Sequence, residues 1–70
     1  MNTQNNRTNI LRSNYQLLDK RGRVTYRKKM IELCGWASEK SFYRKIRDDY
    51  IPTPIEEIAS RMAIDVTLNN

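Results

Sequence analysis

Three cationic side chains recur at helical spacing in the middle of the chain. Lys40, Arg44 and Arg47 stand at positions i, i+4 and i+7, so a helix over residues 38–48 would carry them on one face. Arg offers a pair of donors that fits a guanine edge, and Lys can reach a base edge or a phosphate. The chemistry that this face allows is therefore binding to a nucleic acid.

The residues before and within this helix predict how it is held. Gly35 permits the positive φ that an abrupt reversal requires, and Trp36 would fill the angle between two helices. Ser38 is a candidate N-cap for the new helix. Phe42 and Ile46 fall on the face opposite the cations, where they would anchor the helix to a core. The sequence therefore predicts a helix-turn-helix.

Two helices are expected before this turn. The first should cover residues 9–20, with Gly22 as a left-handed cap after it, and the second should run from Thr25 as N-cap to about Cys34. Asn14 interrupts the apolar stripe of the first helix without a reason visible in the sequence. That stripe comprises Ile10, Leu11, Tyr15, Leu17 and Leu18.

A further helix should begin at Thr53, where the order Thr53-Pro54-Ile55-Glu56 predicts a capping box with Pro at the first helical position. It should extend to Ala63. Residues 64–68 then alternate apolar and polar side chains like a short strand. The stripe expected to face the core comprises Ile55, Ile58, Ala59 and Met62.

These elements predict an all-α fold, a small helical bundle of about four helices that contains a helix-turn-helix. Residues 1–7 are polar and read as a flexible N-terminal arm, residues 8–63 as the helix-turn-helix domain, and residues 64–70 as a C-terminal tail. A chain of 70 residues has no room for a separate catalytic domain.

Charge is segregated along the chain, whose formal net charge is +5. Residues 1–24 hold five basic side chains and one acidic, and residues 25–47 hold seven basic and two acidic. Residues 48–70 hold one basic and five acidic side chains. The first two-thirds therefore favour a polyanionic partner.

Several classes of function are disfavoured. The chain has one cysteine, Cys34, and no histidine, so an internal disulfide and a zinc finger are excluded. We expect no metal and no cofactor. The chain offers no catalytic dyad and no phosphate-binding loop, so we expect a protein that is not an enzyme. No apolar stretch is long enough to cross a bilayer, and no signal peptide is recognisable, so a cytoplasmic location is expected.

The segment Gly35-Trp36-Ala37-Ser38-Glu39-Lys40-Ser41-Phe42-Tyr43-Arg44-Lys45 resembles the turn and recognition helix of small bacterial helix-turn-helix regulators. It is similar to the Gly-Val-Ser-x-x-Thr-(Leu/Val)-Tyr pattern of tetracycline-repressor-type domains. The helix over residues 53–63 resembles the closing helix of phage-repressor-like proteins. The resemblance covers roughly residues 25–63. It implies that Ser38, Lys40, Ser41, Tyr43 and Arg44 face DNA.

We therefore expect a sequence-specific protein that binds double-stranded DNA, a small transcriptional regulator acting as a homodimer on two half-sites, with no small-molecule substrate. The base-facing residues would be Ser38, Lys40, Ser41, Tyr43, Arg44 and Arg47. The phosphate-contacting residues would be Arg21, Arg23, Arg27, Lys28 and Lys29. Two alternatives stay open: a protein-interaction adaptor on the same scaffold, favoured by the acidic C-terminal third, and an excisionase-like architectural DNA-binding protein.

Overall fold

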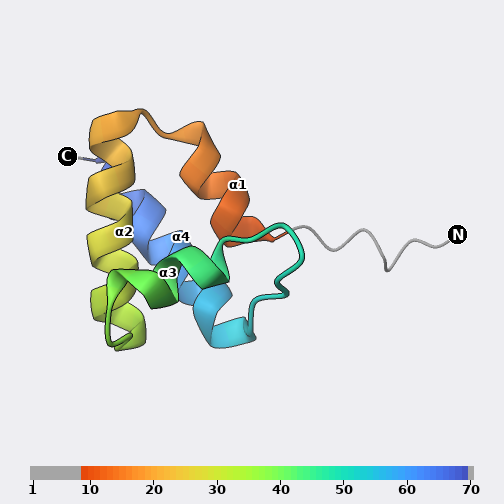
Figure 1. The fold of residues 1–70 in the computed structure, drawn as a ribbon. Coiled ribbons are helices and arrows are strands. Elements are labelled where there is room, and N and C mark those ends of the chain that lie inside the picture. The colour runs from red at the N-terminus through yellow and green to blue at the C-terminus, as the bar shows by residue number, and fades with distance from the viewer. Residues whose placement is uncertain (1–8, 70) are drawn as a thin grey trace, which may run out of the picture.

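Four helices follow one another along residues 9–69, the part of the chain that the computed structural model describes. They are α1 (Ile10–Leu17), α2 (Lys20–Cys34), α3 (Glu39–Lys45) and α4 (Pro54–Leu68) (Figure 1). Over this described range there is no strand, so the fold is a compact all-α domain. The predicted arm, residues 1–7, lies outside the described residues.

The helices enclose one core. α4 packs chiefly on α2, α1 packs on α4 and α2, and α3 crosses in front of α2 and α4 in Figure 1. Aromatic rings fill the centre, with the Phe42 ring close to those of Tyr15, Tyr26 and Trp36. The buried apolar side chains are Leu11, Leu18, Tyr26, Met30, Phe42, Ala59 and Ala63.

A buried polar network joins three of the helices. The Asn14 amide donates to Ser60 Oγ at 2.8 Å, and the hydroxyls of Ser60 and Tyr26 are 2.5 Å apart. Ser60 and Tyr26 are fully buried, so these bonds satisfy groups that have no access to water. The network gives Asn14 the role that its place in the apolar stripe of α1 left unexplained.

The boundary between the first two helices differs from the prediction. α1 ends at Leu17, and Asp19 caps α2, because its carboxylate accepts a hydrogen bond from the Gly22 N–H at 2.8 Å. Gly22 therefore lies in the first turn of α2 and is not a left-handed cap. Its role is close approach, since a Cβ there would lie 3.1 Å from Asp19 Oδ1. Thr25 is inside α2 and is not an N-cap.

The turn after α2 confirms the sequence prediction. Gly35 has φ 68°, and the Trp36 N–H donates to the Ile31 carbonyl at 3.1 Å, the bond of a Schellman motif. Ser38 is the N-cap of α3, but its side chain makes no capping hydrogen bond. α3 ends at Lys45, three residues before the predicted end.

The start of α4 is as predicted, whereas its end is not. The Thr53 hydroxyl accepts from the Glu56 N–H, and the Glu56 carboxylate accepts from the Thr53 N–H, which completes the capping box. The helix then continues to Leu68, so the strand expected at residues 64–68 is wrong. The reason is tertiary packing: Ile64 packs against the core one position after the fully buried Ala63, so the helical register continues.

The buried face of α4 is also not the predicted one. Ile55, Ile58 and Met62 are exposed, whereas Ala59 from the predicted stripe is buried. The helix turns small and polar side chains inward, and these let α2 approach closely enough for its large Tyr26 to fill the space between them. The inward residues of α4 are Glu56, Ala59, Ser60 and Ala63.

Two side chains of the first predicted stripe are exposed as well. Leu17 is 81% exposed and Ile10 is 38% exposed, whereas their neighbours Leu18 and Leu11 are buried. Within residues 9–69, no helix has the length and apolar character needed to cross a bilayer.

Candidate nucleic-acid interface

The predicted cationic face of α3 is exposed to solvent. Phe42 is fully buried and Ile46 packs against the core, as the sequence predicted, so Lys40, Arg44 and Arg47 point outward. Lys40 and Arg44 form no ion pair with any residue in the described range. Arg47 lies just beyond α3, with its Nε 3.5 Å from Asp49 Oδ1, but both side chains are about 70% exposed and such a pair contributes only about 0–1 kcal/mol.

The other predicted base-facing residues lie around this face. Ser38 is exposed at the N-terminal edge of α3, and Ser41 is half-buried on one flank. Tyr43 is on the other flank, 44% exposed, with its ring edge-on to Phe42 at a centroid distance of 5.4 Å. Its hydroxyl is already occupied, since it accepts a hydrogen bond from Arg27 at 3.2 Å.

Arg27 clamps α3 onto α2. Besides its bond to Tyr43, its Nη2 lies 3.6 Å from Glu39 Oε2 in the first turn of α3. The side chain is only 16% exposed, and its buried Nε has no hydrogen-bond partner within the described residues. Arg27, predicted to contact phosphate, therefore holds the orientation of α3 in this structure.

Arg23 also has a structural role. Its guanidinium donates to the Tyr15 carbonyl at 3.0 Å and to the Gln16 carbonyl at 3.2 Å, and its Cζ lies 5.0 Å from the Tyr15 ring centroid. It thus binds two carbonyls at the C-terminal end of α1, of which that of Tyr15 also accepts from the Leu18 N–H. Together with Arg27 and Lys20 it lines a hollow beside Tyr15, which the acidic Asp19 also lines.

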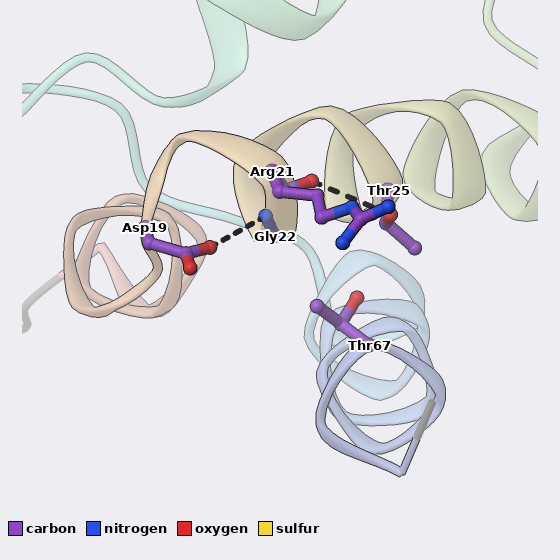
Figure 2. Close-up of a pocket in the computed structure, with 5 residues that line it drawn as sticks. All are labelled: Asp19, Arg21, Gly22, Thr25 and Thr67. Carbon is purple, nitrogen blue, oxygen red and sulfur yellow. Dashed lines mark hydrogen bonds between the residues drawn. The ribbon is translucent and has the colours of Figure 1, made fainter.

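The remaining predicted phosphate contacts are dispersed along α2. Lys28 is exposed, and Lys29 forms a 3.3 Å ion pair with Glu32. Arg21 lines a different hollow, between the first turns of α2 and the end of α4, where Thr67 lies opposite (Figure 2). Because successive helical residues are about 100° apart, Arg21 and Lys29 point away from the side of α2 that Arg27 presents to α3. The five predicted residues therefore do not form one surface.

Two residues that the sequence did not single out hold the C-terminal end of α3. The Asn9 amide donates to the carbonyls of Lys45 and Arg47 at 2.8 and 2.7 Å, while its oxygen caps α1. Arg12 Nη1 donates to the Ile46 carbonyl at 3.2 Å. No local pattern could reveal hydrogen bonds to residues 36 and 38 positions away.

A second set of polar contacts, among Lys45, Tyr50 and Glu56, connects α3 to α4. Lys45 Nζ lies 3.2 Å from Glu56 Oε2, and Tyr50 donates to Glu56 Oε1 at 2.6 Å. Burial raises the pKa of Glu56, but bonds from Tyr50, the Thr53 N–H and Lys45 outweigh it, so the pKa is lowered. The pKa of Lys45 is raised, first by its hydrogen bond to Tyr50 and also by Glu56. Both groups are therefore charged at neutral pH.

Cys34 is half-buried next to this group. Burial raises the pKa of its thiol, and the nearby Glu56 carboxylate raises it further. The thiol is therefore protonated and weakly nucleophilic at neutral pH.

No protein-family model, curated protein or solved structure matches the chain. The residues themselves define the class: a four-helix all-α domain with an exposed cationic face on a short helix that contacts from α1, α2 and α4 hold in place.

Proposed function

We propose that this protein binds double-stranded DNA in a sequence-specific manner, with α2, the turn at Gly35 and α3 acting as a helix-turn-helix. The observation that carries the proposal is that Lys40 and Arg44 stand exposed, without an ion pair in the described range, on a helix whose opposite side is fixed by the buried Phe42. With its side chains a helix is about 10–12 Å across, so it fits a major groove of about 12 Å width.

The proposed roles differ among the cations. Lys40 and Arg44, with Arg47 beyond the end of the helix, contact base edges. Arg44 is the best candidate for a bidentate contact to guanine, because its guanidinium has no competing acceptor among the described residues. Lys28 contacts phosphate. Arg27 orients α3, because its Nε is buried and its Nη atoms are engaged by Tyr43 and Glu39.

A protein of this kind acts on transcription by occupying an operator. We therefore propose a small transcriptional regulator. An excisionase-like architectural protein, which would also bind DNA, is the alternative. A circular-permutation assay separates the two, because an architectural protein bends its site strongly, whereas a simple regulator need not.

The experiment that tests the proposal is selection of bound duplexes from a random pool, followed by titration of the selected duplex at several salt concentrations. Affinity should fall steeply with salt, as it does when a protein displaces counterions from phosphates. Arg44→Ala should weaken specific binding by about 1–3 kcal/mol and relax the preference at one base pair. Arg61→Ala, an exposed charge on α4, is the matched control and should change affinity little. A pool that yields no consensus, or an affinity insensitive to salt, would contradict the proposal.

A protein-interaction adaptor remains the second candidate because of one observation: the apolar side chains of Ile55, Ile58 and Met62 are exposed on α4. A pull-down that retrieves one defined protein after nuclease treatment, together with no DNA consensus, would favour the adaptor.

A further inference from the structure

An apolar stripe runs along the outer side of α4. It consists of Ile55, Ile58, Met62 and Val66, whose exposed fractions are 74, 57, 51 and 39%. We call it the α4 stripe. Ile51, which is 61% exposed, lies just before the helix. Spacings of three and four residues place the four side chains on one face, and nothing within residues 9–69 covers them.

The α4 stripe is close to self-complementary. Its midpoint lies between residues 60 and 61, and its members are spaced almost equally on both sides of that point. An antiparallel second helix with the same sequence would therefore place Ile55 opposite Val66 of the second copy. In the same register Ile58 would meet Met62 of the second copy. Contacts of this kind, in which one patch meets itself across a twofold axis, define an isologous interface.

We propose that a second copy of this chain docks on the α4 stripe, with the two α4 helices antiparallel. The stripe contains no charged residue, which disfavours a nucleic acid as its occupant. The adjacent edge carries one basic and one acidic residue, Arg61 and Asp65, and so has no net charge. The cationic face lies on another helix, so docking through α4 leaves Lys40 and Arg44 free in both copies.

The size of the stripe sets the strength of the dimer. A stable interface involves about 20–30 residues from each partner, many more than the stripe and Ile51 supply. The dimer should therefore be weak, with a dissociation constant of micromolar or above, and the protein should be in monomer–dimer equilibrium.

Sedimentation equilibrium of the full chain without DNA, over roughly 10 µM to 1 mM, tests the inference. The wild type should shift from monomer towards dimer with concentration. The double variant Ile58→Glu/Met62→Glu should raise the dissociation constant by at least about tenfold, because it buries charge in an apolar interface. Leu17→Glu, which adds a charge at an exposed leucine outside the stripe, is the control and should dimerise like the wild type. Because Ile58 and Met62 are exposed, the double variant should keep the helical circular-dichroism spectrum.

A monomeric wild type at the highest concentration, or equal dimerisation of the double variant and the wild type, would overturn the inference. Orientation is tested separately in a Cys34→Ser background. Chains carrying Ile58→Cys and Met62→Cys are mixed and mildly oxidised. Antiparallel docking predicts that the mixed 58–62 disulfide dominates, whereas a dominant 58–58 product would contradict it. These measurements need no DNA, so their failure would leave the proposed function standing.

Discussion

The Nζ atom of Lys45 lies 3.2 Å from Oε2 of Glu56, so one ion pair joins the end of α3 to the first turn of α4. The same carboxylate accepts from Tyr50 at 2.6 Å and from the Thr53 N–H at 3.0 Å. Glu56 thus completes the cap of α4 and fixes α3 at once. The orientation of the exposed cationic face consequently depends on a carboxylate that makes no contact with that face.

Replacing this carboxylate should destabilise the fold. Glu56→Gln removes the negative charge that pairs with Lys45, whose ammonium group is partly buried. The free energy of unfolding should therefore fall by roughly 1–3 kcal/mol. Urea denaturation followed by circular dichroism measures it. Glu32→Gln is the control, because Glu32 forms only an exposed pair with Lys29, and its effect should stay within about 0.5 kcal/mol. Equal losses in the two variants would contradict the role assigned to Glu56.

The stability of the fold should depend on pH through the same residue. The pKa of Glu56 is lower in the folded chain than its ordinary value, so the unfolded chain binds its proton more tightly. The resulting stabilisation is fully present above the ordinary pKa of a glutamate, about 4.3, and is lost as pH falls through the folded pKa. Thermal unfolding from neutral pH down to acid should show a steeper loss for the wild type than for Glu56→Gln. Parallel curves would exclude Glu56 as the source.

The features that the sequence predicted correctly are those marked by a local chemical signal. The capping box at Thr53 and the left-handed turn at Gly35 depend on residues within about one helical turn, so the pattern alone suffices. The boundary before α2 is wrong because two local signals compete there. Gly22 favours an end, but the Asp19 carboxylate takes the Gly22 N–H and starts a helix instead.

The buried face of α4 could not be predicted from hydrophobicity. Ala59 and Ser60 are buried because Tyr26 of α2 supplies the bulk and the hydroxyl that meets Ser60, whereas Ile55 and Ile58 stay outside. This choice depends on the distance between two helices, which the sequence of one helix does not contain.

Only the part of the candidate site that depends on local helical spacing could be predicted from the sequence. A period of 3.6 residues identified the exposed Lys40 and Arg44. This period could not show which basic side chains are engaged in hydrogen bonds within the fold. Arg27 bonds to Tyr43, 16 positions away, and Arg23 bonds to the carbonyl of Tyr15, eight positions away.

The buried hydroxyl of Ser60 should matter more to stability than an exposed one. Ser60→Ala leaves the Asn14 amide and the Tyr26 hydroxyl without their shared partner, which should cost about 1–3 kcal/mol. Ser38→Ala is the matched control, because Ser38 is exposed and makes no capping hydrogen bond. Differential scanning calorimetry compares the two, and a larger loss for Ser38→Ala would show that the network contributes little.

Glu39 should weaken DNA binding. It is the one acidic residue of α3, its side chain is 62% exposed, and its carboxylate lies 3.6 Å from Arg27 Nη2. In the proposed complex this carboxylate would face the phosphates and repel them. Glu39→Gln should therefore tighten binding about two- to fivefold at low salt, and the gain should shrink as salt screens the repulsion.

Titration of the selected duplex at two ionic strengths measures this effect, with Glu32→Gln as the control. Glu32 has a similar exposed fraction, 70% against 62% for Glu39, but lies on α2, where it pairs with Lys29. Both variants raise the net charge of the protein by one, so a general attraction to DNA would increase their affinities equally. A gain confined to Glu39→Gln would locate the phosphates beside the first turn of α3. An equal gain in both variants, or none in either, would mean that the first turn of α3 does not approach the DNA.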